Sequence, residues 1–311
     1  MLITNFTPRD NASHYSSQKD YIEWWYVDSI FNSGHQLAGS FAIWGNPRSQ
    51  DCVTRSDFLL VAPDGSILDF SERVNPLDFE ASINKCDVRL GRHFLCDRGG
   101  TYHLHLERGD GVILELSILP DCPGFGYQHF FDSSHNLHFS WVVPAARATV
   151  NGFFQIGGER IALTGCGYHD HNWASVSLSQ ALKGWKWGRF FGEDSGLVYA
   201  VVEGNDSVLF GGLAYLERGE KSFDYGYLWF GFPPPKTNLQ AISSGWNLSI
   251  SEPEIHVDMI LEKIRPVLQK ERRSDYSRFL SRTSMRIKLM GREFEQTGFM
   301  IHEFKQLEQV V

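Results

Sequence analysis

Residues 101–107 read Thr-Tyr-His-Leu-His-Leu-Glu, so polar and large apolar side chains alternate along the run. On an extended backbone, this alternation places the two histidines on one face and Tyr102, Leu104 and Leu106 on the other. The next residues, 108–111, read Arg-Gly-Asp-Gly and have the composition of a tight turn. The stretch therefore predicts an antiparallel strand with one buried face, followed by a hairpin connection.

The same two signals recur along most of the chain. The predicted strands are 24–31, 36–44, 56–61, 101–107, 112–119, 137–143, 149–154, 159–164, 197–203, 208–216, 246–250, 284–289 and 294–304. Two stretches lack the pattern: residues 178–182 are predicted as a short helix, and residues 255–268 as a longer non-strand connection. The Phe-Pro-Pro-Pro run at 232–235 is predicted as a stiff loop. Short strands with tight turns indicate a mostly β fold of antiparallel sheets closed into barrels.

The strand signals fall into two series of similar length. The second series begins near Arg147, so the predicted boundary lies around Pro144 to Arg147. A chain of 311 residues is long for one domain and comfortable for two. We therefore expect two β-barrel domains, residues 1–145 and residues 146–311.

Composition excludes several classes of protein. The formal net charge of −8 argues against nucleic-acid binding, and the basic residues between 270 and 282 are interrupted by acids, as on a solvated face. The five cysteines form no CxxC pair, which argues against a zinc knuckle or a disulfide framework and favours a cytoplasmic protein with reduced thiols. Neither a signal peptide nor an apolar run of about 20 residues is found, so no integral membrane segment is expected. The aromatic content of 14% fits either a large β core or the wall of an apolar ligand pocket.

The first informative motif is Glu-Trp-Trp-Tyr-Val-Asp at residues 23–28. As a strand it places Glu23, Trp25 and Val27 on one face and the other three residues on the second face, so each face carries an acid beside aromatic bulk. Two interpretations stay open at this point. The motif is either a core strand whose acids reach solvent at its ends, or a strand that is buried against the other domain or lines a cavity.

The second motif is Gly-Cys-Gly-Tyr-His-Asp-His-Asn-Trp at residues 165–173, and Trp-Lys-Trp-Gly-Arg follows at 185–189. After a glycine pair that we expect to be flexible, an extended backbone would place His169 and His171 on one face, with Tyr168, Asp170 and Asn172 on the other. So polar a run requires a hydrogen-bonded network, because an unsatisfied buried polar group costs about 1–3 kcal/mol.

Three interpretations of this second motif compete. His169 and His171 could bind a metal with an acid, although no third ligand has a clear spacing. The motif could be a structural network that ties a loop to the barrel. Alternatively, Asp170 or a histidine could position or protonate a ligand.

The order and spacing of the three motifs resemble the lipocalin-like hydroxyneurosporene synthase superfamily, which includes carotenoid hydratases and lipocalin-type Diels–Alderases. The resemblance covers residues 22–304. It implies two lipocalin-like barrels, a hydrophobic ligand site at or near their interface, and no requirement for an organic cofactor or metal. The central motif departs from that of carotenoid hydratases, because Asn172 is followed by Trp-Ala-Ser-Val and the next acid is Glu193. This departure argues against hydration of a carotenoid specifically.

These observations lead to a functional hypothesis. We expect a cofactor-free cyclase or isomerase that folds a hydrophobic polyene, polyketide or isoprenoid substrate into one reactive conformer. The alternatives are a hydratase that adds water to a terminal isoprenoid double bond, and a non-catalytic protein that binds a lipophilic ligand. The candidate catalytic residues are Glu23, Asp28, His169, Asp170 and Asn172. The candidate substrate-binding residues are Trp24, Trp25, Tyr26, Tyr168, His171, Trp173, Trp185 and Trp187.

The two motifs, although distant in sequence, are expected to meet around an apolar pocket. At least one of Glu23, Asp28 and Asp170 should face into that pocket. Burial beside aromatic rings would raise the pKa of such a carboxylate and make it a better proton donor near neutral pH.

Overall fold

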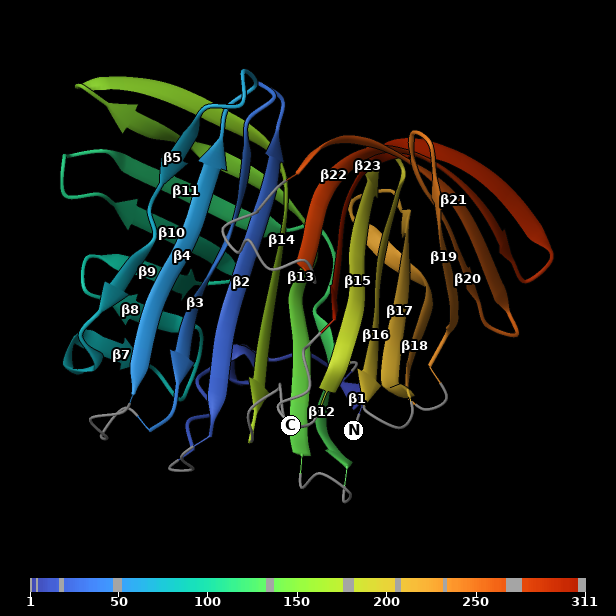
Figure 1. Ribbon diagram of the computed structural model, residues 1–311, viewed down its shortest axis with the longest axis horizontal. Coiled ribbons are helices and arrows are strands. Elements are labelled where there is room, and N and C mark those ends of the chain that lie inside the picture. The colour runs from blue at the N-terminus through green and yellow to red at the C-terminus, as the bar shows by residue number, and fades with distance from the viewer. Residues whose placement is uncertain are drawn as a thin grey trace. The chain divides into compact units, whose positions relative to one another are not determined.

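The computed structural model describes residues 2–3, 5–16, 20–46, 52–132, 137–175, 182–204, 208–231, 234–266 and 276–306. Most of these residues lie in β-strands, which form two compact units, Met1–Leu178 and Ser179–Val311 (Figure 1). Two 3-10 helices, η1 (Pro8–Asn11) and η2 (Pro76–Asp78), are the only helical elements of the described residues. The predicted mostly β fold class is therefore confirmed. None of the helices in those ranges is long and apolar enough to span a bilayer.

Unit 1 contains one antiparallel sheet of 14 strands. Its strands are β1 (Leu2–Ile3), β2 (Ile22–Phe31), β3 (Gln36–Trp44), β4 (Val53–Val61), β5 (Ile67–Asp69), β6 (Glu72–Val74), β7 (Phe79–Ala81), β8 (Asp87–Leu90), β9 (His93–Arg98), β10 (Thr101–Glu107), β11 (Ile113–Pro120), β12 (Phe125–Asp132), β13 (Leu137–Ile156) and β14 (Glu159–Ala174).

The main path of this sheet runs β5-β4-β3-β2-β14-β13-β11-β10-β9-β8-β7. Most neighbours in the path are also neighbours in sequence, as in a meander, but β2 pairs with β14, from the far end of the unit. The sheet is curled (Figure 1). Alternate side chains of its strands form a buried core, among them Trp25, Phe41, Leu104 and Leu116, all with at most 2% of their surface exposed. The alternation of residues 101–107 is confirmed, because Tyr102, Leu104 and Leu106 belong to this core.

Unit 2 contains one antiparallel sheet of nine strands. They are β15 (Leu182–Gly192), β16 (Ser195–Gly204), β17 (Val208–Arg218), β18 (Phe223–Gly231), β19 (Lys236–Ile242), β20 (Gly245–Ser251), β21 (Ile255–Pro266), β22 (Tyr276–Leu289) and β23 (Arg292–Gln306).

The sheet of unit 2 has the order β18-β17-β16-β15-β23-β22-β21-β20-β19. It is again a meander in which the first strand, β15, pairs with the last, β23. The sheet is also curled (Figure 1). It has its own apolar core, in which Phe190, Tyr199, Ile250 and Ile287 are fully buried. Two curled antiparallel sheets of this kind are what a pair of lipocalin-like barrels requires.

The predicted domain boundary at residues 145 and 146 falls inside a single strand. β13 runs from Leu137 to Ile156 and pairs with β14 along most of its length. Register shifts on either side of Ala145 mark bulges next to Pro144, a residue that has no N–H to contribute to the ladder. The proline therefore bends the strand and does not end it, and the two compact units divide between Leu178 and Ser179 instead.

The predicted connection at 255–268 is also wrong over the described part of that range. Residues 255–266 form strand β21, which pairs with β20 and β22. Ile255, Val257, Met259 and Leu261 are buried and the residues between them face outward, which is the period of two typical of a half-buried strand. Leu182 belongs to β15; the rest of the predicted helix, part of the proline-rich loop and the basic residues 270–273 lie outside the described residues.

The glycine pair that the sequence suggests to be flexible lies in the extended β14. A Cβ atom at Gly165 would overlap the carbonyl oxygen of Ile30 and approach the Cα of Phe31 on the paired strand β2. A Cβ atom at Gly167 would press against Val150 on β13. The glycines therefore permit close approach of the neighbouring strands.

Gly165→Ala should lower the free energy of unfolding by about 3 kcal/mol, because the added methyl forces β2 and β14 apart. The measurement is urea unfolding followed by far-ultraviolet circular dichroism. Gly109→Ala is the matched control, since a Cβ at Gly109 meets nothing within 4 Å. Equal stability of the two variants would contradict this explanation of Gly165.

Candidate functional site

The two motifs lie side by side on β2 and β14, so the expectation that they meet is confirmed. Antiparallel pairing places each residue of the first motif directly opposite one of the second. The opposed pairs are Glu23–Trp173, Trp24–Asn172, Trp25–His171, Tyr26–Asp170, Val27–His169 and Asp28–Tyr168.

Opposed residues in a ladder point to the same side of the sheet, so the six pairs alternate between two faces. One face carries Trp25 and Val27 and packs on the hydrophobic core of unit 1; we call it the core face. The other carries Tyr26 and Asp170; we call it the opposite face. The candidate residues therefore form two separate groups, one on each side of the same two strands.

The core-face group is covered by the segment that precedes β2, residues 8–15, which we call the N-terminal segment. Ser13 donates from Oγ to Oε2 of Glu23 over 3.0 Å, and the backbone N–H of His14 donates to Oε1 over 2.7 Å. The indole N–H of Trp25 donates to the carbonyl of Asn11 over 3.4 Å. These contacts fix the N-terminal segment against the first motif.

Glu23 is buried and hydrogen-bonded to His171, with 2.9 Å between Oε1 and Nε2. Burial raises the pKa of Glu23 to about 7, and the hydrogen bonds from His14 and Ser13 offset part of that rise. Glu23 is thus a carboxyl group that exchanges its proton near neutral pH, as the sequence suggests for a buried acid.

The two histidines of the second motif are neutral. Burial lowers the pKa of His169 to about 3 and that of His171 well below its usual range. His169 donates from Nδ1 to the carbonyl of Tyr26 over 2.8 Å and accepts at Nε2 from the Asn11 amide over 2.9 Å. Its tautomer is therefore fixed, and neither imidazole carries the second ring proton that would let it act as a general acid at neutral pH.

Stacked rings enclose His171. Its ring centroid lies 4.4 Å from that of Trp25 and 4.9 Å from that of Trp173, and His14 stacks on Trp173 at 3.7 Å. This packing supports the interpretation of a structural network for the core-face group. It ties down the N-terminal segment, whereas the sequence suggested that the motif ties down a loop.

A metal site at the two histidines receives no support from this geometry. Nε2 of His169 and Nε2 of His171 are both engaged, with Asn11 and Glu23 respectively. Within the described ranges, no group of three His, Cys, Asp or Glu side chains is placed to hold a metal ion.

The opposite face centres on the carboxylate of Asp170, which accepts three hydrogen bonds from side chains. Tyr168 donates from its hydroxyl to Oδ2 over 2.8 Å, and Trp141 donates from its indole N–H to the same oxygen over 3.1 Å. Asn172 donates from its amide to Oδ1 over 2.9 Å. Asp170 is therefore a buried carboxyl group that is held by three donors and has aromatic neighbours.

A second Tyr–Asp pair lies beside the first. Tyr26 donates from its hydroxyl to Oδ2 of Asp28 over 2.8 Å, and the rings of Tyr26 and Tyr168 are 6.1 Å apart. Asp28 is completely buried. The opposite face thus holds two carboxylates, each bound by a tyrosine two residues earlier on its own strand.

This division separates the five candidate catalytic residues. Glu23 and His169 belong to the core face, and Asp28, Asp170 and Asn172 to the opposite face. The candidate wall residues divide in the same way. Trp25, His171 and Trp173 lie on the core face, and Trp24, Tyr26 and Tyr168 on the opposite face.

The remaining candidates, Trp185 and Trp187, lie on β15 in unit 2. The indole N–H of Trp185 donates to Oε1 of Glu303 over 2.6 Å. Arg189, on the same face of the strand, is fully buried, with its guanidinium 3.9 Å from the centroid of the Phe191 ring. Arg189 is not among the candidates predicted from sequence, although its two-residue spacing from Trp187 is a usable signal.

Trp141 and Glu303 were also missed. Each is marked only by a hydrogen bond to a residue on another strand. Trp141 donates to Asp170, and Glu303 accepts from Trp185. No local pattern marks either residue in the sequence.

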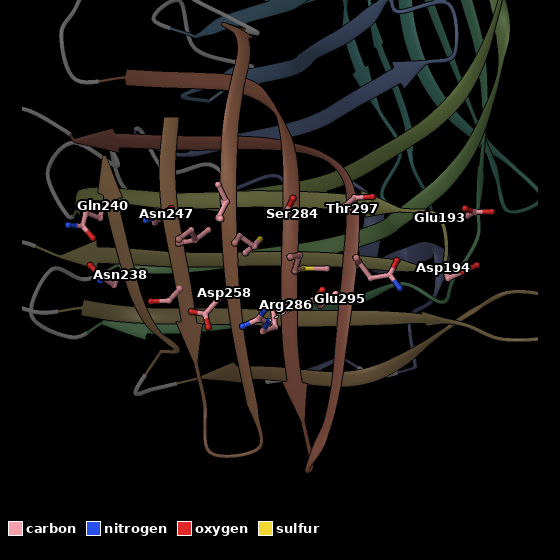
Figure 2. Close-up of a pocket in the computed structure, with 16 residues that line it drawn as sticks. Glu193, Asp194, Asn238, Gln240, Asn247, Asp258, Ser284, Arg286, Glu295 and Thr297 are labelled. Carbon is pink, nitrogen blue, oxygen red and sulfur yellow. Dashed lines mark hydrogen bonds and ion pairs between the residues drawn. The ribbon is translucent and has the colours of Figure 1, made fainter. Parts of the chain in front are cut away.

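The pocket drawn in Figure 2 lies on unit 2 and has a volume of about 730 Å³. Its lining is largely polar, with Asn247, Asp258, Arg286 and Glu295 among the contributing side chains. Neither motif lines it, so it is not the apolar pocket that the sequence predicts around them.

The pKa of Glu23 predicts a specific dependence of stability on pH. Between pH 4.5 and 7 the folded protein holds a proton on Glu23 that the unfolded chain releases, so this residue's contribution to stability falls as pH rises through that window. Glu23→Gln keeps the shape of the side chain but cannot ionise. The free energy of unfolding of this variant should therefore fall by about 2–3 kcal/mol less than that of wild type as pH rises through this window.

Urea unfolding at pH 5, 6, 7 and 8 measures this effect, and Glu80→Gln, on an exposed residue of β7, is the control. His169 and His171 affect stability in the opposite direction, because their lowered pKa values contribute stability that is lost as pH falls below 6.5. Wild type and all the variants share this contribution, so it does not affect the comparison. Parallel pH profiles for wild type and Glu23→Gln would contradict the assignment.

Comparison with known sequences gives short local matches. No family model matches the chain. A hydroxyneurosporene dehydrogenase from Chlorobaculum tepidum is 31% identical over 83 residues, which are 24% of this chain and 22% of that protein. The quinolone epoxide rearrangement protein penF from Penicillium thymicola is 34% identical over 53 residues, 17% of this chain and 14% of that protein. The matched segments thus span less than a quarter of either relative.

Comparison with solved structures extends over the whole chain. A protein described as AttH from Nitrosomonas europaea has a TM-score of 0.64 at 17% identity, over 98% of this chain and 99% of that one. Kievitone hydratase from Nectria haematococca has a TM-score of 0.57 at 10% identity, over 95% and 92% of the two chains. CghA has a TM-score of 0.54 at 12% identity, over 94% and 90%. The chain therefore shares a lipocalin-like fold with these solved structures over nearly its whole length.

Proposed function

We propose that the protein is a cofactor-independent cyclase or isomerase that acts on a hydrophobic polyene, polyketide or isoprenoid, with Asp170 as its anionic centre. One observation carries this proposal: the buried Asp170 carboxylate accepts hydrogen bonds from Trp141, Tyr168 and Asn172. These three donors hold the carboxylate in a fixed position before any substrate arrives. A fixed anion requires no reorganisation when positive charge develops next to it.

The chemistry of the opposite face suits a substrate that passes through an electron-poor state. Asp170 can stabilise developing positive charge or accept the proton that such a state loses, and the faces of Trp24 and Tyr168 add cation–π attraction. Binding a flexible chain in one conformer contributes further, since orientation alone can lower a barrier by several kcal/mol. Asp28, held by Tyr26, is the second acid of this proposed centre.

The core-face residues have a supporting role in this proposal. Glu23 exchanges its proton near neutral pH, but it lies on the other side of the β2–β14 pair from Asp170. His169 and His171 are neutral and are held by Asn11, Tyr26 and Glu23. We propose that this group keeps β2 and β14 in the register that places Asp170 among its donors.

The names of similar proteins support reactions of this general kind. One relative is named for the rearrangement of a quinolone epoxide, and one protein of the same fold is named a hydratase. Hydration is therefore the second candidate: a proton donor protonates one carbon of the double bond, water adds to the cation so formed, and Asp170 accepts the proton that this water then loses, so the net change is the gain of one water. A protein that only binds a lipophilic ligand is the third. From its composition we further propose a soluble, cytoplasmic location.

Mass spectrometry of products distinguishes the three candidates. Purified protein is incubated with a panel of linear polyenes, isoprenoids and polyketide-like trienes, and each reaction is separated by liquid chromatography. A new product of unchanged mass supports cyclisation or isomerisation, and a gain of one water supports hydration. Binding without any new product supports the third candidate and would reject catalysis for this panel.

Asp170→Asn should remove most turnover and leave the fold largely intact. The amide keeps the volume of the side chain but loses the negative charge, and we expect kcat to fall by about 100-fold or more. Product formation and melting temperature are measured on the same preparations. Asp78→Asn, on an exposed residue of η2, is the control. If Asp170→Asn lowers the melting temperature strongly but preserves turnover per folded molecule, Asp170 is structural and the proposal fails.

A further inference from the structure

Unit 2 repeats, at its own central strand pair, the arrangement found in unit 1. In each unit the first long strand of the meander pairs with the last, β2 with β14 and β15 with β23. Each last strand carries a histidine followed by an acid, His169-Asp170 in β14 and His302-Glu303 in β23. In both units the alternation of the strand turns the histidine toward the unit's own core and the acid away from it.

The two histidines have matching surroundings. His302 is fully buried, and its Nε2 lies 2.5 Å from the hydroxyl oxygen of Tyr199, a residue of the unit 2 core. In unit 1 the ring of His169 packs edge-on against the core tyrosine Tyr102. Burial lowers the pKa of both histidines to about 3. Both are thus neutral residues of a barrel interior.

The two acids also match, because each accepts an indole N–H. Asp170 is bound by Trp141, and Glu303 by Trp185. Glu303 is 5% exposed and also accepts from Nε of Arg278 over 2.7 Å, within an ion pair. A hydrogen bond to an ionised carboxylate is about twice as strong as a neutral one, so the Trp185 indole is firmly held.

We propose that Glu303 is the counterpart of Asp170 in unit 2, and that it is a positioning residue that fixes the Trp185 indole as a contact surface for an apolar, polyene-like ligand. The inference rests on the proposed function for the class of ligand, but the placement of Trp185 is independent of it. Arg278 holds the carboxylate, and the carboxylate holds the indole.

The benefit of such a tether is lower entropy loss on binding. Trp185 is only half-buried, and a partly exposed indole without a polar anchor has several rotamers available. Ordering a side chain at a binding surface costs about 0.5–1.5 kcal/mol, and a side chain fixed in advance avoids that cost. Lys305 also lies over the Trp185 ring, 5.4 Å from its centroid, and packs against the fixed indole.

The first measurement reads the placement of Trp185 directly. Near-ultraviolet circular dichroism and fluorescence are recorded with and without Trp185→Phe, and the difference gives the Trp185 contribution. Glu303→Gln retains an acceptor oxygen and should preserve this contribution. Glu303→Ala should weaken the circular dichroism band and shift the emission to longer wavelength. Glu293→Gln, at an exposed acid of the same strand, is the control.

The second measurement is the affinity for a ligand. Retinol serves as a fluorescent polyene probe, and its dissociation constant is determined by energy transfer from tryptophan. Glu303→Ala should weaken retinol binding about fivefold, the equivalent of one hydrogen bond, and Glu303→Gln should stay within about twofold of wild type. If Glu303→Ala fails to fold because the part-buried Arg278 loses its carboxylate partner, the double variant Glu303→Leu with Arg278→Met replaces it.

The outcomes separate the inference from the function on which it rests. If Glu303→Ala leaves the contribution of Trp185 to the circular dichroism and fluorescence spectra unchanged, Glu303 does not position the indole. If Glu303→Ala changes the Trp185 spectra but not the affinity for retinol, Trp185 is not a ligand-contact surface. If wild type does not bind retinol, the proposed ligand class fails and the ligand-contact role fails with it; the Trp185 spectra still decide the positioning role.

Discussion

The backbone ladder between β2 and β14 joins the first long strand of unit 1 to its last and sets the position of every candidate residue in that unit. Its tightness depends on Gly165 and Gly167, where a side chain would strike the neighbouring strand. Because opposed residues share a face, the register of β2 and β14 creates two chemically different groups of side chains, one on the core face and one on the opposite face. A slip of β14 by one residue would turn Asp170 toward the apolar core and turn His169 and His171 away from it.

Burial acts differently in the two centres. On the core face it raises the pKa of Glu23, and the hydrogen bonds that compensate for the desolvation come mainly from the N-terminal segment and His171. On the opposite face Asp170 has its donors on β14 and the adjacent β13, so its charge is supported by the sheet itself. The core-face contacts hold the N-terminal segment against β2 and include one group that titrates near neutral pH. The contacts on the opposite face fit the catalytic role that we propose for Asp170.

The recurrence of this arrangement in unit 2 argues that it is a property of the fold. A meander whose first and last strands pair gives each unit one strand pair at the middle of its sheet, and that pair is where buried polar side chains find partners on both sides. Tyr199 with His302, and Trp185 and Arg278 with Glu303, supply those partners in unit 2. The different donors at Asp170 and Glu303 leave room for different roles.

The sequence by itself determined the β class, the strands that carry the motifs and the division of each motif between two faces, because side-chain alternation is a local property of an extended backbone. It misjudged Pro144, which a bulge accommodates inside β13, and residues 255–266, whose alternation includes the polar His256 and Asp258. Only the tertiary structure decided which residues meet. Trp141 reaches Asp170, and Ser13 and His14 reach Glu23, because strand register and chain crossing bring them together. Those contacts join different elements, so local periodicity carries no record of them.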